Sequence, residues 1–475
     1  MKNFSVTKTL VASAATIGIT MYFAHENKVS CDIDLNRTKA EEVKFENTQY
    51  EKAIQRSRDI LQRIKDEYGI PGLVVGVSID GKTIWKEGFG FADIENRVLC
   101  TSDTVMRIAS ISKSITMAAV AKLWEHGKLD LDKPVQEYVP SFPQKSYNGK
   151  PVTITCRQLV SHLSGIRHYH EEKNESKKTD SKLNNSEKVN EMDLKEYYLT
   201  VRYNDIVTAL DLFKDDPLVE HPGTKFLYST HGWTLVSAIV EAASKEQFTV
   251  HMTKLFKTLG LINTYLDEND VLIYNRSRNY MKNKKGFIIN APYVDNSYKW
   301  AGGGFLSTVG DLLQFANAML YSLQVKEPKV IHPSDSAVKK APEENVDRNN
   351  INIGHLPNGT ADQKQLPGFL TSKTIEAMWE PVYPATNYGM GWSVYPQKQE
   401  CEFCSKSKFC VCHTGSAVGA SSVLLIVPKA FSKSKNLDYK PVPLPQGIVV
   451  VVLTNMHSIN LYPTALKITQ QFEIQ

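Results

Sequence analysis

The chain has 475 residues, of which 42% are hydrophobic and 23% charged, values that are ordinary for a globular protein with a sizeable core. The net charge is only +5, from 56 basic and 51 acidic residues, and no nucleic-acid-binding motif or phosphate-binding glycine loop accompanies it. We therefore expect no nucleic-acid partner. Seven cysteines, an odd number in so long a chain, do not indicate a disulfide framework.

The N-terminus has the layout of a targeting segment. Lys2 and Lys8 precede an apolar, small-residue run over 10–23, and the first 24 residues contain no acid. Secretory signals share this layout, as do mitochondrial presequences, which usually carry more arginine. The run is shorter than the about 20 residues of a membrane span. We interpret 1–24 as a targeting or anchor segment, with membrane association through the apolar run, and 25–44 as a polar linker.

The next segments alternate between helical and strand patterns. Apolar residues recur at helical spacing over 48–68 and predict an amphipathic helix. The period then changes to that of a strand over 73–79, and Asp80-Gly81 predicts a hairpin turn into a return strand over 83–91. A second helix is expected over 110–126.

Two charged stretches, 172–196 and 326–364, are poor in apolar residues. Such compositions favour surface loops or disorder over packed structure. Because the patterns on both sides continue, we interpret the stretches as insertions within one domain that extends over 45–475.

Strand signals return near the C-terminus and precede a last helical pattern; these segments cover 391–395, 416–427, 448–453 and 458–472. Strands at both ends of the domain and helices between them indicate an α/β (α+β) fold. We expect one antiparallel sheet built from both termini, with a helical lobe formed by the middle of the chain.

Ser110-Ile111-Ser112-Lys113 has the pattern S-x-x-K at the start of the second predicted helix. Residues three apart share a helix face, so the lysine can lie beside the serine hydroxyl. A buried lysine loses its proton more readily and can then accept the serine proton. The pattern alone is common by chance, and an exposed serine and lysine are the usual alternative.

Three further segments accompany S-x-x-K in a fixed order: Ser161-His162-Leu163-Ser164-Gly165, Tyr228-Ser229-Thr230 and His413-Thr414-Gly415. With "PGTKFLYST" at 222–230 and "AGGGFLST" at 301–308, the sequence resembles the serine β-lactamase and penicillin-binding family near its class C branch. The resemblance implies a β-lactamase/transpeptidase-like fold and a serine hydrolase without a cofactor.

The resemblance also implies a role for each motif position. Ser110 would be the nucleophile, with Lys113 and Tyr228 exchanging its proton, and the substrate-binding residues would be Thr230, His413, Thr414 and Gly415. The backbone N–H groups of Ser110 and of the strand after His413 would form the oxyanion hole. We expect no metal at this site.

Two motif positions depart from the family pattern. Thr230 stands where the family usually has Asn, so one hydrogen bond to a substrate amide is lost and efficient β-lactam turnover is in doubt. His413 replaces a lysine and would bind a substrate carboxylate when protonated. His162 lies away from the three motifs in sequence, and we interpret it as a structural residue.

The long insertion and the Tyr-Ser-Thr variant are most similar to the animal mitochondrial branch of the family. That similarity implies a mitochondrial address, in the intermembrane space, with secretion as the alternative. It also implies a peptidase or amidase with a peptide or amide substrate and a link to lipid metabolism. The oligomeric state stays open, with a homo-oligomer as one option. An esterase with the same site and a non-catalytic self-assembling scaffold remain alternatives.

Four thiols lie immediately before His413: Cys401, Cys404, Cys410 and Cys412. They could bind zinc, form a disulfide or remain free thiols. The one-residue spacing of the second pair is unusual for a zinc knuckle. A link of either kind would brace the loop that carries His413.

Overall fold

A computed structural model describes the domain over residues 48–169, 195–325, 367–384, 386–397, 408–429 and 444–473. The predicted targeting segment, the linker and nearly all of both predicted insertions lie outside these residues. None of the helices in these ranges combines the length and the apolarity that crossing a bilayer requires.

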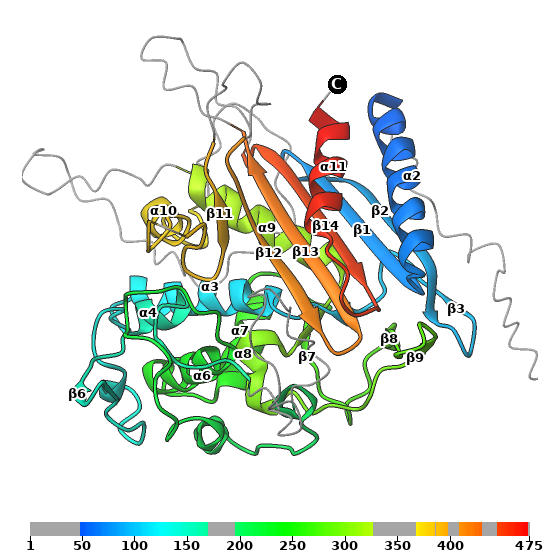
Figure 1. The fold of residues 1–475 in the computed structure, drawn as a ribbon. Helices are drawn as coiled ribbons and strands as arrows, with labels where there is room; N and C mark the ends of the chain where they lie inside the picture. Colours follow the sequence, from blue (N-terminus) through cyan, green and yellow to red (C-terminus); the bar gives the residue numbers. More distant parts are fainter. Residues whose placement is uncertain are drawn as a thin grey trace, which may run out of the picture. The chain divides into compact units, whose positions relative to one another are not determined.

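A seven-stranded antiparallel sheet is built from both ends of the domain (Figure 1). In spatial order its strands are β11 (Ser393–Tyr395), β12 (Cys410–Ala417), β13 (Ala420–Pro428), β14 (Gly447–Thr454), β1 (Gly72–Ile79), β2 (Lys82–Asp93) and β3 (Val98–Leu99). The pairing of β14 with β1, from Leu73 opposite Thr454 to Ile79 opposite Ile448, joins the two halves of the chain. The predicted sheet architecture is therefore confirmed.

The central strands consist largely of β-branched and other apolar residues, which favour a sheet covered on both faces. The predicted turn between β1 and β2 is present, and Asp80 and Gly81 both have positive φ angles, 49° and 79°. This is the backbone that a two-residue hairpin turn requires.

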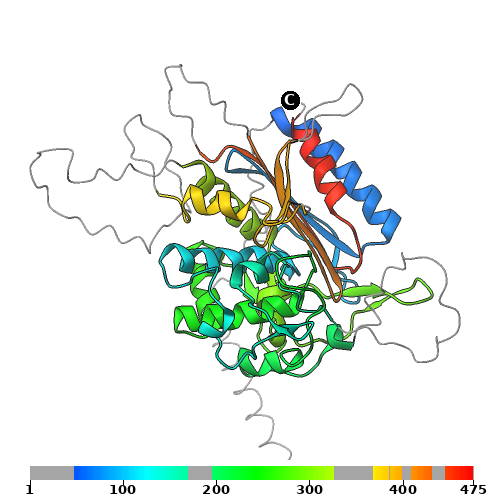
Figure 2. The ribbon, with the colours of Figure 1, turned by 60° about the vertical axis from the view of Figure 1, so that its left-hand side comes forward.

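Helices cover both faces of the sheet. The helices α2 (Glu51–Tyr68) and α11 (Tyr462–Glu473) pack side by side on one face, as Figures 1 and 2 show. The helix α9 (Val309–Gln324) packs against β1 and β14 on the other face. Each face therefore has its own apolar core, and the larger core continues into the helical lobe.

The middle of the chain forms the predicted helical lobe (Figure 1). Its helices are α3 (Ile111–Glu125), α4 (Cys156–Val160), α5 (Ile206–Ala209), α6 (Thr230–Ser244), α7 (Phe248–Thr258), α8 (Trp300–Gly303) and α10 (Ser372–Met378). The sequence pattern predicts one apolar face for α3, but nearly the whole helix is buried. It runs between the sheet and the other helices, so it has no solvent face.

Short strands complete the lobe: β4 (Met106–Arg107), β10 (Phe305–Ser307) and β7 (Tyr265–Leu266) in one sheet, β5 (Ser146–Tyr147) with β6 (Lys150–Pro151), and β8 (Tyr280–Lys282) with β9 (Ile288–Asn290). Short 3-10 helices span Thr48–Tyr50, Val135–Glu137, Lys195–Tyr198, Leu210–Leu212 and Ser297–Lys299.

One predicted strand is wrong. The stretch 416–427 is not a single strand: β12 begins at Cys410, a turn follows at 418–419, and β13 returns from Ala420. Gly419 has φ +73°, a left-handed conformation that permits this reversal inside a continuous apolar run. His413 consequently lies in the middle of β12 instead of at the head of a strand.

Candidate active site

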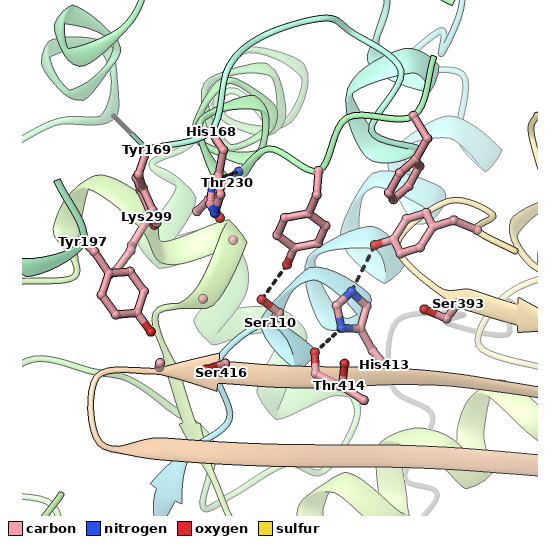
Figure 3. A pocket seen from close by; sticks show the side chains of 16 residues that line it. Ser110, His168, Tyr169, Tyr197, Thr230, Lys299, Ser393, His413, Thr414 and Ser416 are labelled. Atoms are coloured by element: carbon pink, nitrogen blue, oxygen red, sulfur yellow. Dashed lines mark hydrogen bonds between the residues drawn. The ribbon is translucent and has the colours of Figure 1, made fainter. Parts of the chain in front are cut away.

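The three family motifs meet at a cavity of about 360 Å³ between β12 and the helical lobe (Figure 3). The lining includes Ser110, Tyr228, Thr230, His413 and Thr414 from the predicted set. Five of the seven site residues predicted from the sequence therefore line one cavity. The remaining two, Lys113 and Gly415, lie just behind that wall.

Ser110 is the residue immediately before α3, so its backbone N–H lies at the positive end of the helix dipole. The preceding residue, Ala109, has φ +48°, a left-handed conformation that is unusual for a residue with a side chain. Strained backbone of this kind occurs where surrounding structure holds a residue in one orientation. Here it turns the chain sharply from β4 into the helix and directs the Ser110 hydroxyl into the cavity.

Lys113 is fully buried one turn along α3. Its Nζ lies 3.0 Å from Ser110 Oγ and donates a hydrogen bond to the Gly302 carbonyl oxygen at 2.5 Å. Burial, helped by the positive charge of Lys299, lowers the pKa of the Lys113 ammonium well below its usual value. The geometry therefore favours a neutral amine in contact with the serine hydroxyl.

Tyr228 contacts both the nucleophile and Lys113. Its hydroxyl oxygen is 2.7 Å from Ser110 Oγ, and its ring centroid is 4.9 Å from Lys113 Nζ. The tyrosine belongs to the loop that enters α6, whose first turn is capped by the Ser229 hydroxyl. Ser110 therefore lies between two groups that can accept or donate its proton.

His162 holds the Tyr228 loop in place, although its sequence position gave no sign of this. Its carbonyl oxygen accepts from Leu227 N–H at 2.8 Å, and its Nδ1 accepts from Ser229 N–H at 3.1 Å. The imidazole ring packs against the Tyr228 ring with centroids 4.3 Å apart. The expectation of a structural histidine agrees with these contacts, but the residue lies beside the motifs in space.

Gly415 is required by a close backbone approach between β12 and the segment before Ser110. A Cβ atom at this position would lie 2.6 Å from the Ile108 carbonyl oxygen and 2.8 Å from the Ala109 side chain. No residue other than glycine fits without displacing one of these segments. The glycine thus sets the distance between β12 and the nucleophile.

His413 lines the cavity as expected, but its surroundings act against the positive charge that the sequence predicts for it. Its Nδ1 donates to the Thr414 carbonyl oxygen at 2.7 Å, which leaves Nε2 to accept from the Tyr388 hydroxyl at 3.0 Å. Burial and the nearby Lys113 charge lower the pKa of His413 to about 3. The histidine is therefore a neutral, fully hydrogen-bonded part of the cavity wall.

Lys299 is the cation that the sequence analysis missed. It lines the cavity from the segment just before α8, and it is 5% exposed. Its Nζ lies 5.0 Å from the ring centroids of Tyr197 and Tyr298 and 5.8 Å from that of Tyr169. A single lysine before a glycine-rich segment carries no sequence signal, because only the fold brings these three rings around it.

Thr230 begins α6 and faces the cavity, with its backbone N–H donating to His168 Nδ1 at 3.3 Å. Burial and the Lys113 charge lower the pKa of His168 to about 3, so this ring is also neutral. Further lining residues escaped the sequence analysis, among them Tyr169, Tyr197, Tyr388 and Ser416. They lack any local pattern, since each comes from a different loop or strand.

The described residues include two of the four clustered cysteines. Cys410 and Cys412 lie on β12 and are buried free thiols, whereas Cys401 and Cys404 fall outside the described residues. Across the ranges that the structure describes, no group of three or more histidine, cysteine or acidic side chains is arranged to hold a metal ion.

Comparisons with known proteins agree with this geometry. The Beta-lactamase family model matches residues 57–462. The chain is 46% identical over 473 residues to the human "Serine beta-lactamase-like protein LACTB, mitochondrial", covering 89% of this chain and 80% of that protein. It is 45% identical over 478 residues to the Bos taurus protein of the same name, with the same coverage.

Solved structures share the fold at much lower sequence identity. The octameric penicillin-binding protein homologue from Pyrococcus abyssi superposes with a TM-score of 0.60 at 21% identity, covering 87% of this chain and 76% of that one. A class C β-lactamase gives a TM-score of 0.60 at 16% identity, covering 90% and 98%. With the family model spanning nearly the whole described domain, the chain belongs to the β-lactamase family of serine hydrolases.

Proposed function

We propose that the protein hydrolyses a peptide or amide through an acyl-enzyme on Ser110. The observation that carries this proposal is the position of the Ser110 hydroxyl between Lys113 Nζ, at 3.0 Å, and the Tyr228 hydroxyl, at 2.7 Å. Contacts of this length allow proton transfer without rearrangement. Because Lys113 is buried and faces a second cation, its amine is available as the base.

In the acylation step, Ser110 Oγ attacks the substrate carbonyl carbon while its proton passes to Lys113 Nζ. The carbonyl π electrons move to the oxygen, which we propose is stabilised by the backbone N–H groups of Ser110 and Ser416. The carbonyl then re-forms as the C–N bond breaks, and the Tyr228 hydroxyl protonates the leaving nitrogen. Lys113 returns a proton to Tyr228.

Water completes the cycle. It attacks the acyl carbon and loses a proton to the Lys113–Tyr228 pair, and the ester bond to Ser110 breaks as Oγ regains a proton. The products are the carboxylic acid and the regenerated enzyme. An ester substrate would follow the same steps with a better leaving group, so an esterase is the closest alternative chemistry.

The location and assembly of the protein are inferred from its relatives. The human and bovine relatives are called mitochondrial, and the 1–24 segment is compatible with that address. We place the protein in the mitochondrial intermembrane space, acting on a peptide substrate connected with lipid metabolism. The octameric Pyrococcus abyssi homologue supports a homo-oligomer.

The reaction class is tested with purified full chain, a panel of fluorogenic peptide amides and matched p-nitrophenyl esters. We expect burst kinetics with the p-nitrophenyl esters, whose good leaving group makes acylation faster than deacylation, and steady turnover of at least one peptide amide. Turnover of esters alone would make the protein an esterase. The absence of a burst and of turnover with every substrate would contradict the hydrolase proposal.

Replacing Tyr228 by Phe should slow acylation about 10²–10⁴-fold, because it removes a hydroxyl positioned for proton transfer while keeping the ring. The measurement is single-turnover acylation by a peptide amide, with intact mass as the readout. Tyr388→Phe is a matched control, since that hydroxyl contacts His413 instead of the nucleophile. Equal losses in the two variants would argue against a proton-transfer role for Tyr228.

Replacing Lys299 by Met should move the acid limb of the pH–rate profile to higher pH. Lys113 must be neutral to accept the serine proton, so activity falls as pH drops through its pKa. The Lys299 charge lowers that pKa, and removing the charge raises it. We expect a several-fold loss of kcat/KM at the acid end and little change on the alkaline plateau.

Lys299→Arg retains the charge and should retain the wild-type limb. In Lys299→Met, kcat/KM could instead drop equally at all pH values, and only for substrates with a carboxylate. That result would identify Lys299 as a substrate-binding residue without influence on the pKa of Lys113.

A further inference from the structure

The segment 271–294 carries only positive formal charge. It contains no aspartate or glutamate, and its five basic residues are Arg276, Arg278, Lys282, Lys284 and Lys285. This contrasts with the whole chain, in which 56 basic and 51 acidic residues nearly balance. The segment includes the β8–β9 hairpin, which projects from the domain in Figure 2.

Large apolar side chains of the same segment are exposed to solvent. Phe287 is 66% exposed, and Ile288 and Ile289 follow at 41% and 42%. All three residues of β9 are exposed, so the strand has no covered face. In the loop before the hairpin, Leu272 is 93% and Tyr274 is 87% exposed. Apolar clustering of this density on a surface marks an interaction site more often than chance.

The hairpin tip has a defined shape. The Asn283 side-chain oxygen accepts hydrogen bonds from the N–H groups of Lys285 at 2.9 Å and Phe287 at 3.0 Å. The backbone N–H of Asn283 donates to the Phe287 carbonyl oxygen at 2.9 Å, and Gly286 supplies a positive φ of 81°. Lys284, Lys285 and Phe287 are therefore presented together by a preformed turn, which lowers the entropic cost of binding.

The hairpin is fixed to the sheet and adjoins the candidate active site. The Tyr280 hydroxyl accepts from the backbone N–H of Ile94, and Arg278 pairs with Asp93 in β2. At the base of the hairpin, Asn279 and Ala291 approach so closely to Gly419 that a Cβ there would lie 2.5 Å and 2.8 Å from their Cβ atoms. Gly419 belongs to the turn after Ser416 and Ala417, which line the cavity.

We propose that the β8–β9 hairpin docks the protein on a bilayer rich in anionic phospholipid. Lysine side chains pair with lipid phosphates at the headgroup level, while aromatic and branched aliphatic side chains enter the acyl boundary. A lipid surface fits better than a protein groove because Lys284 and Lys285, the charged residues of the tip, are both basic, and the exposed apolar residues follow them on a projecting hairpin. Docking would hold the mouth of the cavity near the membrane surface.

The test is flotation of the purified full chain with vesicles of phosphatidylcholine alone or of phosphatidylcholine mixed with the anionic lipid phosphatidylglycerol. We expect binding to the anionic vesicles only, weakened at high salt because the Debye length shrinks. Lys284→Gln combined with Lys285→Gln should weaken binding about 30-fold, and Phe287→Ser combined with Ile288→Ser at least about tenfold.

Matched controls are Ile262→Ser, at an exposed apolar position outside the segment, and Lys373→Gln, at an exposed lysine; both should bind as wild type. Hydrogen exchange gives a local readout that does not depend on the N-terminal segment. The backbone amides of residues 283–290 should exchange more slowly when anionic vesicles are present.

Two outcomes would overturn the proposal. One is unchanged exchange in 283–290 with anionic vesicles, or hairpin variants that float like wild type. The other is a change in oligomer size of the hairpin variants without any loss of vesicle binding, which would assign the hairpin to a contact between protein copies.

Discussion

Replacing Ser110 by Ala is expected to abolish the covalent adduct with a fluorophosphonate probe and to lower the acylation rate by at least about 10³–10⁶-fold. The Ser110 hydroxyl oxygen lies 3.0 Å from the buried Lys113 Nζ and 2.7 Å from the Tyr228 hydroxyl. The measurement is intact mass after incubation with the probe, followed by peptide mapping of the modified residue. The fold should be retained, because the Ser110 side chain makes no capping hydrogen bond to α3.

Ser416→Ala provides a matched control in the same cavity. It removes a lining hydroxyl but keeps the backbone N–H proposed for the oxyanion hole, so labelling of Ser110 should persist. An adduct that remains in Ser110→Ala, or wild-type protein that is never labelled, would contradict the acyl-enzyme and favour a non-catalytic scaffold with this fold.

Replacing Lys113 by Met or by Arg is expected to lower acylation by about 10³-fold or more, for two different reasons. Met removes the nitrogen that accepts the serine proton but keeps an unbranched chain of similar volume. Arg keeps a cation that does not release its proton in proteins. Stopped-flow acylation with a peptide amide measures both effects. Activity in Lys113→Arg close to wild type would show that the lysine acts as a fixed charge instead of a base.

The Met variant should also have a different dependence of stability on pH. Burial lowers the pKa of Lys113 in the folded protein below its value of about 10.5 in the unfolded chain. Between these two pKa values only the unfolded chain binds the proton, so the free energy of unfolding rises with pH. The slope contributed by this residue is at most about 1.4 kcal/mol per pH unit. Lys113→Met removes the contribution, and below the window it should stabilise the fold.

Urea unfolding at pH 7 and pH 9 checks this difference. Lys128→Met, at an exposed position just beyond α3, should reproduce the wild-type slope and so isolates the effect of burial. If the free energy of unfolding changes equally with pH in the wild type and in Lys113→Met, the buried lysine keeps its proton in the folded state.

The tertiary structure changes the expected chemistry of His413 and adds Lys299 to the same cavity, where Figure 3 labels both side chains. The motif position predicts a pH-dependent cation on β12, but burial and the nearby Lys113 charge lower the pKa of the histidine to about 3. The positive charge of the cavity comes instead from Lys299, on a different element. Neither change leaves a trace in local sequence, because each depends on residues distant in the chain.

The sequence by itself determined that strands from both ends of the domain build the sheet, that a hairpin turns at Asp80-Gly81, and that Lys113 lies one helical turn from Ser110. These features rest on local periodicity, turn chemistry and short spacings within one element, which the chain encodes directly. Only the tertiary structure decided which side chains of the cavity are charged and which residues hold Tyr228 in place. Burial and hydrogen-bond partners set those properties, and both come from segments that meet only after folding.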